Sequence, residues 1–166
     1  MKLKVKIKRI NKNISLPKFT YKGDWVDLRA SETVEFEAPK VVSKQLQFDL
    51  KLLPLGVAIE LPKGFEAIVN PRSSLPKGFG LMLANSQGVI DQSYCGDKDE
   101  WKAPLIAIRK TSIEEGERIV QFKIQLSQKA TLWQKIKWLF TSGFKFVEVE
   151  SLNNNIRGGF GSTGKL

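Results

Sequence analysis

Hydrophobic and polar residues alternate along much of this chain, and this period of two limits the fold more than any other feature of the sequence. At the start, Leu3, Val5 and Ile7 lie between lysines in a run that covers residues 2–8. The same alternation recurs over residues 34–37, 57–61, 105–109, 119–126 and 144–150. Because successive side chains of a strand point to opposite faces, the pattern predicts short strands, each with one buried face. Strands of this length, bounded by Gly, Pro and Asn, are typical of an all-β sandwich or barrel.

The segment 131–142, TLWQKIKWLFTS, has a different character, because its hydrophobic residues recur at helical spacing. Leu132, Ile136 and Leu139 fall on one side of a helix, and Thr131 is a residue type that favours the capping position. We expect a short basic helix whose apolar side packs on its own barrel. The alternative is a helix that binds a partner or a membrane surface, since exposed tryptophan with lysine is also typical of such helices.

A length of 166 residues suits one domain with one hydrophobic core. After residue 150 the chain becomes polar and glycine-rich, SLNNNIRGGFGSTGKL, and offers little to pack. We therefore expect a folded domain over residues 1–152 and a flexible tail over residues 153–166.

A single cysteine cannot form an internal disulfide, which suits a reducing, cytoplasmic setting. The alternating N-terminus also lacks the apolar run of a signal peptide.

The chain carries 27 Lys and Arg against 17 Asp and Glu, a net charge of +10 that favours anionic partners such as nucleotides. It contains no histidine. That absence excludes Ser-His and Cys-His nucleophilic pairs and most zinc sites. Chemistry near neutral pH is left to carboxylates, amines, a phenol and hard cations held by oxygen. Asp97 and Asp99 are not candidates for catalysis, because they look like part of a solvated, charged loop. Cys95 has no imidazole partner and looks structural.

The stretch SQGVIDQSYCGD, residues 86–97, contains the strongest candidates for chemistry. Asp91 follows two apolar residues and is the natural base for activating water in a chain without histidine. Tyr94, three residues later, offers a ring that could pack against a sugar. Upstream, residues 78–90 predict a hairpin of two apolar strands around an Asn-Ser-Gln-Gly turn, whose backbone groups could read a base edge.

Two further stretches carry groups suited to anions or cations. Arg72, Ser73 and Ser74 follow a proline, and a guanidinium with two hydroxyls suits a phosphate. Asp27 lies between two apolar residues and is expected to be buried with a cation or an arginine as its partner. Gln121 lies beside a predicted strand.

The end of the tail, residues 159–165, spells G-x-x-x-x-G-K, but no Ser or Thr and no helix follow it. A P-loop NTPase is therefore excluded. Glycine-rich backbone beside Arg157, Ser162 and Thr163 still suits a polyphosphate, and Phe160 adds a flat apolar face.

Taken in order, these stretches resemble the deoxyuridine triphosphatase (dUTPase) family. The matching motifs are DLRA from Asp27, PRSS at 71–74, NSQGVIDQSY at 85–94, GERIVQ at 116–121 and GGFGSTG at 158–164. The resemblance covers the chain from residue 23 to residue 164. It implies an all-β, distorted jelly-roll barrel and a homotrimer with shared active sites. The implied reaction is the hydrolysis of dUTP to dUMP and pyrophosphate with Mg²⁺ as cofactor.

The resemblance also implies roles for individual residues. Asp91 would orient the attacking water and contact the sugar 3′-hydroxyl, and Tyr94 would pack under the deoxyribose. The residues that would read uracil through the backbone are Asn85, Gly88, Val89 and Ile90. Phe160 would close over uracil.

On the phosphate side, the resemblance implies water attack in line on the α-phosphorus of a triphosphate held in a reactive curl. Asp27 would hold Mg²⁺ through a water. The residues implied to contact the phosphates are Arg72, Ser73, Ser74, Gln121, Arg157, Gly161, Ser162 and Thr163.

The chain departs from the family pattern in its tail. The usual arginine lies five residues before the phenylalanine, whereas Arg157 lies three residues before Phe160 and Asn155 takes the usual place. Ser74 stands where a glycine is usual. Arg157 as a phosphate ligand therefore depends on the reach of its long side chain.

Two alternatives stay open. A dCTP deaminase-like enzyme shares the implied architecture, but it needs a catalytic glutamate after the hairpin. A regulatory or nucleic-acid-binding protein on the same scaffold would use the positive charge. As partners we expect dUTP and further copies of the chain, and no stable nucleic acid or membrane. The helix 131–142 looks like an insertion and is the place for any extra partner.

Overall fold

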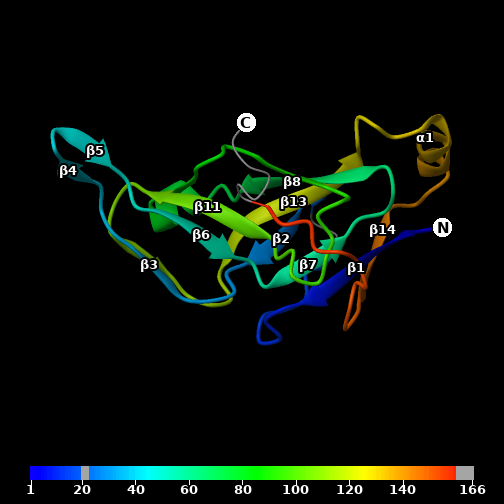
Figure 1. Ribbon diagram of the computed structural model, residues 1–166, viewed down its shortest axis with the longest axis horizontal. Coiled ribbons are helices and arrows are strands. Elements are labelled where there is room, and N and C mark those ends of the chain that lie inside the picture. The colour runs from blue at the N-terminus through cyan, green and yellow to red at the C-terminus, as the bar shows by residue number, and fades with distance from the viewer. Residues whose placement is uncertain (20–22, 160–166) are drawn as a thin grey trace.

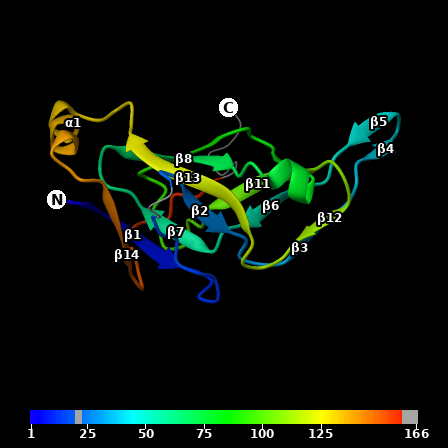
Figure 2. The same cartoon turned by 180° about the vertical axis from the view of Figure 1, so that it is seen from behind.

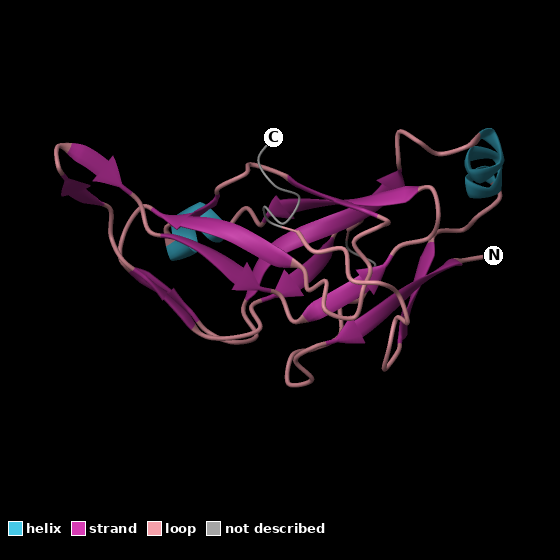
Figure 3. Cartoon of the chain, viewed as in Figure 1, coloured by secondary structure: helices cyan, strands magenta, loops and turns pink. Residues whose placement is uncertain are grey.

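The computed structural model describes residues 1–19 and 23–159 and consists mainly of strands (Figure 3). The largest sheet has the order β10 (Gly88–Asp91), β8 (Phe65–Pro71), β13 (Arg118–Leu126), β2 (Val26–Arg29). The second has the order β6 (Leu50–Pro54), β11 (Lys102–Ala107), β9 (Leu81–Leu83), and the third β14 (Phe144–Glu148), β1 (Leu3–Arg9), β7 (Val57–Glu60). Two smaller pairs are β12 (Thr111–Ile113) with β3 (Val34–Phe36), and β4 (Lys40–Val42) with β5 (Gln45–Gln47). The helical elements are η1 (Leu75–Phe79) and α1 (Leu132–Leu139).

The alternation in the sequence correctly predicts the all-β class and six of the strands in the described residues, β1, β3, β7, β11, β13 and β14. Each of the six alternating stretches overlaps one of these strands, and in β1 the residues Val5 and Ile7 are buried while Lys4 and Lys6 are exposed. The sheets enclose one core whose largest fully buried side chains include Trp101 and Phe122, packed edge to face at 5.2 Å. Over the described residues the strands belong to separate sheets and do not close one continuous hydrogen-bonded barrel.

The predicted hairpin over residues 78–90 is wrong, although both strands exist. β9 pairs with β11, whereas β10 pairs with β8, so the two strands lie in different sheets. The turn between them is tight, with Ser86 at a φ of 59° and its N–H donating to the Leu83 carbonyl. The chain diverges after this turn because each strand finds its hydrogen-bond partner in another sheet. The result is a corner that exposes the backbone of residues 84–87.

The helix predicted over residues 131–142 is confirmed as α1, which begins with a complete capping box between Thr131 and Gln134. The expectation that its apolar side packs on the barrel is wrong, because Leu132 and Leu139 are exposed. Trp138 makes the contact instead, stacking on Phe144 with ring centroids 5.0 Å apart. The sequence periodicity identified an apolar side but not which side faces the core.

The molecule is elongated, with the β4–β5 hairpin at one end and α1 at the other (Figure 1). Figure 2 shows the same arrangement from behind, with the N-terminus close to α1 in both views. Among the described residues, no helix combines the length and the apolar character needed to cross a membrane.

Candidate functional site

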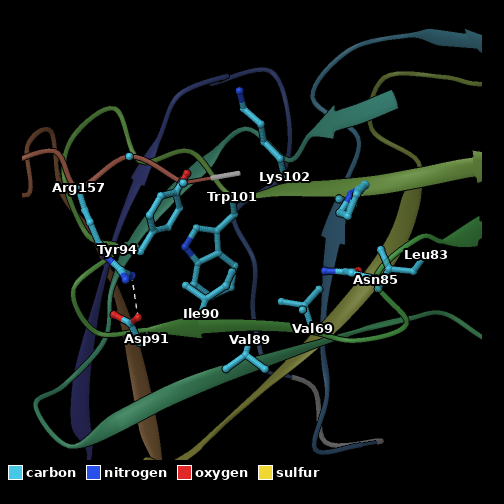
Figure 4. A pocket seen from close by; sticks show the side chains of 15 residues that line it. Val69, Leu83, Asn85, Val89, Ile90, Asp91, Tyr94, Trp101, Lys102 and Arg157 are labelled. Atoms are coloured by element: carbon cyan, nitrogen blue, oxygen red, sulfur yellow. Dashed lines mark hydrogen bonds and ion pairs between the residues drawn. The ribbon is translucent and has the colours of Figure 1, made fainter. Parts of the chain in front are cut away.

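Asp91 and Tyr94 line a cavity of about 270 Å³, which we call the Tyr94 pocket. β10 forms one wall, the segment 101–104 forms another, and residues 157–159 of the tail complete the rim. Figure 4 shows apolar side chains on the floor and Asp91 at the mouth. Other lining residues include Val69, Leu83, Asn85, Gly88, Val89 and Ile90. The structure thus brings together every residue that the sequence assigned to the base and the sugar within the described range.

The carboxylate of Asp91 lies at the end of β10, where it accepts hydrogen bonds from the backbone N–H and hydroxyl of Ser93. Its second oxygen accepts from the Arg157 guanidinium at 2.7 Å, drawn as a dashed line in Figure 4. Partial burial raises the pKa of Asp91, but the Ser93 hydrogen bonds and the Arg157 charge outweigh it and lower the pKa below the ordinary carboxyl value. Asp91 is therefore ionised at neutral pH and can accept a proton or hold a water.

Tyr94 presents its ring to the cavity, and its hydroxyl donates to the Glu100 carbonyl at 2.9 Å. Burial, together with the charges of Asp99 and Glu100, raises the pKa of the Tyr94 phenol. The phenol therefore stays protonated and the ring is fixed. A Cβ on Gly159 would lie 3.0 Å from this ring, so the tail backbone approaches Tyr94 as closely as a glycine allows.

Sequence reasoning missed Trp101, which is fully buried and lines the same pocket. Its indole N–H has no hydrogen-bond partner among the described residues. A buried donor without a partner costs free energy unless a ligand or water completes it, so its position in the pocket wall is informative. Figure 4 shows its ring beside Tyr94 and Ile90. The signal available in the sequence was a tryptophan directly after a run of charged residues, which by itself indicates a core residue.

The expectation of a solvated loop at Asp97 and Asp99 is wrong. Asp99 is 1% exposed and accepts hydrogen bonds from the backbone N–H groups of Gly96, Arg157 and Gly158. Although burial raises its pKa, these three donors lower the pKa of Asp99 below the ordinary value. This carboxylate fastens the described part of the tail to the pocket rim.

Asp97 makes a second attachment of the same kind. It accepts from the Leu152 N–H and the Ser151 hydroxyl, and it pairs with Lys8 at 3.1 Å. The Leu152 and Ser151 hydrogen bonds lower the pKa of Asp97 to about 2. Sequence spacing could not reveal these contacts, because the partners lie more than fifty residues away along the chain.

A second cluster, which we call the arginine site, consists of Asp27, Arg72, Arg118 and Gln121. Asp27 forms ion pairs with Arg72 and Arg118, which confirms that it needs an arginine partner. It is not buried as expected, since its side chain is 30% exposed. Gln121 is the Cα partner of Asp27 across β13 and β2, and its side-chain amide donates to the Pro71 carbonyl.

Ser73 and Ser74 follow Arg72 on the surface, and Ser74 precedes η1. Clefts lined by Arg72, Ser74 and Arg118, and by Asp27 and Arg118, adjoin this cluster. The sequence also predicted roles for Phe160, Gly161, Ser162 and Thr163, which lie outside the described residues.

Asp91 of the Tyr94 pocket and Gln121 of the arginine site lie far apart within one chain. In the shared sheet, Asp91 is opposite Glu66 of β8, whereas Gln121 is opposite Asn70 of the same strand. These positions are about 13 Å apart along β8, because a strand rises about 3.3 Å per residue. β10 and β13 also lie on opposite sides of β8, which increases the separation. Groups this far apart cannot contact one phosphate.

Sequence comparison with known proteins finds relatives that share one name. No protein-family model matches the chain. The chain is 42% identical over 162 residues to the SPbeta prophage-derived deoxyuridine 5′-triphosphate nucleotidohydrolase YosS of Bacillus subtilis, covering 98% of this chain and 99% of that protein. It is 35% identical to the deoxyuridine 5′-triphosphate nucleotidohydrolase of Corynebacterium glutamicum, covering 97% and 95% of the two chains.

Solved structures agree with the sequence relatives. A crystal structure of a dUTPase from Streptococcus mutans has a TM-score of 0.62 at 27% identity and covers 75% of this chain and 98% of its own. A dUTPase from phage phi11 of Staphylococcus aureus, described with a structural Mg(II) ion, has a TM-score of 0.60, covering 77% of this chain and 94% of its own. At 17% identity, that second structure supports the fold alone.

Proposed function

The chain belongs to the dUTPase family, and we propose that it hydrolyses dUTP to dUMP and pyrophosphate at a site shared between the Tyr94 pocket of one subunit and the arginine site of another. The observation that carries this proposal is the pair of half-sites described above. One half has the shape and chemistry for a nucleoside, and the other has the charge for a triphosphate. Neither half is complete alone.

The Tyr94 pocket is proposed to bind deoxyuridine. The exposed backbone around Asn85 and Gly88 would read the base edge, and a thymine methyl would clash there. The Tyr94 ring would pack under the sugar and leave no space for a 2′-hydroxyl. The fixed phenol supports this role, because its hydrogen bond to Glu100 prevents the ring from swinging away.

Asp91 is proposed to orient the attacking water. The water oxygen would form a bond to the α-phosphorus while the bond from that phosphorus to the bridging oxygen breaks and pyrophosphate leaves with the electron pair. A lowered pKa keeps Asp91 ionised, so it can accept a hydrogen bond or the proton of the water. Arg157 occupies the same carboxylate now, so productive binding requires it to move away from Asp91.

The arginine site is proposed to bind the triphosphate. Arg72 supplies a fork of donors, and Ser73, Ser74 and Gln121 add neutral donors. Arg157, once released from Asp91, has the charge to bind the terminal phosphate. Phe160, Gly161, Ser162 and Thr163 are proposed to close over the bound nucleotide as a lid.

The residues present fit Mg²⁺ as a cofactor held mainly by the substrate. Among the described residues, no group of three or more His, Cys, Asp or Glu side chains gathers to hold a metal. Asp27 lies between two arginines, which suits contact through a water better than a direct bond. Mg²⁺ bound to the triphosphate would supply charge neutralisation and hold the phosphates in a defined geometry.

A homotrimer is proposed as the assembly that joins the two half-sites. The protein is proposed to work in the reducing environment of the cytoplasm. The outward face of the β6–β11–β9 sheet supports self-association, because Leu50 and Leu52 on β6 and Met82 on β9 are 42–57% exposed. The partly exposed Ile106 of β11 lies between them, opposite both Leu50 and Met82. A continuous apolar sheet face of this kind is unusual on a monomer. Exposed Val41 and Leu46, which are opposite each other in the β4–β5 hairpin, add to the exposed apolar surface.

The test is pyrophosphate release from dUTP, dTTP, dCTP and UTP in parallel, each with Mg²⁺ and with a chelator. We expect release from dUTP to exceed that from each other nucleotide by roughly a hundredfold or more. The Asp91→Asn variant is the inactive control. Equal rates with all four nucleotides would contradict the assignment of the pocket, and deamination of dCTP would replace it with the alternative enzyme class.

A further inference from the structure

α1 turns its apolar side to solvent. Leu132, Trp133, Leu139 and Phe140, the residue after the helix, are 71–81% exposed. At about 100° per residue, these four and the half-buried Ile136 fall within an arc of about 120°. Helices of globular proteins normally bury such a stripe, so this one lacks a cover within the described chain.

The opposite side of α1 fixes the helix to the body. Trp138 packs edge to face on Phe65 at 5.3 Å and stacks on Phe144 at 5.0 Å. The Gln134 amide lies against Gly64, where a Cβ would come within 2.6 Å of its side-chain carbon. The capping box stabilises the first turn. The helix is therefore presented in one orientation, with the apolar stripe outward.

Every charged residue in the segment that carries the stripe is basic. No Asp or Glu occurs between Glu117 and Glu148. On the helix, the exposed residues Lys135 and Lys137 fall about 40° beyond the two edges of the stripe. The exposed residue Lys129 precedes the helix.

The N-terminus adds to the same end of the molecule. The Ser142 N–H donates to the Met1 carbonyl at 3.1 Å, and the Leu3 N–H donates to Gly143 at 2.9 Å. Met1 is 77% exposed, and Lys2 is also exposed. Figures 1 and 2 show this terminus beside α1, at the end opposite the β4–β5 hairpin.

We propose that α1 and the N-terminal residues form a surface that binds anionic phospholipid bilayers, with the apolar stripe inserted at the headgroup level and the lysines on lipid phosphates. Aromatic and leucine side chains between two rows of lysine match the layered chemistry of a membrane interface. The membrane leaflet that faces the cytoplasm, the compartment of the proposed reaction, carries the complementary negative charge. This inference goes beyond the proposed function. It takes up the membrane-surface alternative for the helix, in place of the expectation that the protein has no stable membrane partner.

The test is co-sedimentation of the full-length protein with vesicles of phosphatidylcholine alone and of phosphatidylcholine mixed with phosphatidylserine. Binding is expected with the mixed vesicles, with a blue shift of tryptophan emission. The Lys135→Glu/Lys137→Glu variant should lower the bound-to-free ratio by roughly tenfold or more. Leu139→Ser should lower it by a similar factor, because the apolar contact is lost. Lys44→Glu/Lys110→Glu makes the same charge change away from α1 and should bind like the parent protein.

Hydrolysis of dUTP and the oligomeric state provide the second readout. Both are expected to be unchanged in the α1 variants, which separates this proposal from the proposed function. Absence of binding to the mixed vesicles would overturn the membrane proposal. A change of oligomeric state in Leu139→Ser would assign the stripe to a subunit contact. Stronger binding to polyglutamate than to vesicles would assign the stripe to an acidic protein partner. Either result would contradict the membrane proposal.

Discussion

At the scale of single residues, the site depends on carboxylates that look alike in the sequence and differ in their surroundings. Asp91 sits at the mouth of the pocket with one oxygen on Ser93 and the other on Arg157. Asp99, eight residues later, is buried and holds the tail backbone. The same type of side chain therefore lines the pocket in one place, where it is proposed to take part in chemistry, and attaches the tail in the other.

Asp91→Asn should lower kcat for dUTP by about a thousandfold, because the amide cannot accept a proton from the attacking water. KM should change only a few-fold, since the sugar contact is retained. Pyrophosphate release at a series of dUTP concentrations gives both kcat and KM, and calorimetric titration of dUTP gives the dissociation constant, which should also change only a few-fold. Asp24→Asn removes an exposed carboxylate elsewhere and should keep the parental rate. Near-parental turnover in Asp91→Asn would remove this residue from the mechanism.

Trp101→Phe should raise KM for dUTP by about two- to tenfold, the effect expected for one neutral hydrogen bond, with a smaller change in kcat. An aromatic ring is retained, although the phenyl group is smaller than the indole and fills only part of its space. Trp133→Phe, at an exposed position on α1 that lines neither the Tyr94 pocket nor the clefts at the arginine site, is the matched control. If KM is the same in Trp101→Phe and in the parent, the indole N–H is not a ligand donor.

At the scale of elements, the tail and the loop 96–100 form one unit. Two carboxylates of the loop accept backbone hydrogen bonds from the chain between residues 152 and 158. The glycines at both sides make the approach possible, since a Cβ on Gly96 would lie 2.7 Å from the Ile156 backbone. The tail is thus positioned over the pocket by backbone contacts that are independent of its own side chains.

Asp99→Asn should loosen this attachment, because the amide offers one neutral oxygen where the carboxylate accepts three N–H groups. The peptide bond after Arg157 should then be cut by trypsin several times faster. Cleavage after Lys44, in the exposed β4–β5 turn, is the internal control and should be unchanged. An unchanged cleavage rate at Arg157 would show that other contacts hold the tail.

The attachment of the tail through Asp97 should weaken at acid pH. Its pKa is about 2 in the folded protein, below the ordinary unfolded value of about 3.9. Its stabilisation is therefore fully present above pH about 4 and is lost as the pH falls through about 2. Hydrogen exchange of the Leu152 amide, corrected for the intrinsic rate, should lose protection across this window. In Asp97→Asn the corrected rate should be independent of pH; the same pH profile in both proteins would contradict the assignment.

The sequence predicted the parts of the site that depend on order along the chain, and not those that depend on distant contacts. Alternation predicted the strand that carries Gln121, and the motif order singled out Asp27, Asp91 and Tyr94. Periodicity alone could not decide which side of α1 faces the core, because Trp138 and Leu139 are both apolar. The buried role of Asp99 and the separate pairing of β9 and β10 follow from partners far away in the sequence.

At the scale of the whole molecule, the chain has the features of one part of a larger assembly. Its nucleoside half-site and its phosphate half-site are separated along β8, and an apolar sheet face lies exposed. In the proposed closed ring of identical subunits, the first half-site of each copy would lie against the second half-site of another. The elongated shape keeps α1 and the β4–β5 hairpin at opposite ends (Figure 1), so the proposed lipid binding and the proposed subunit contact would use different surfaces.

Co-expression of Asp91→Asn and Arg72→Ala subunits tests the shared site most directly. Each variant alone should be nearly inactive, because every site in it lacks one half. Random mixed rings should recover about a quarter of the parental dUTP hydrolysis, since about one contact in four joins an intact Asp91 to an intact Arg72. The matched control is the same two proteins purified separately and mixed without subunit exchange. Recovery confined to the co-expressed rings would support the account, and no recovery in correctly assembled mixed rings would contradict it.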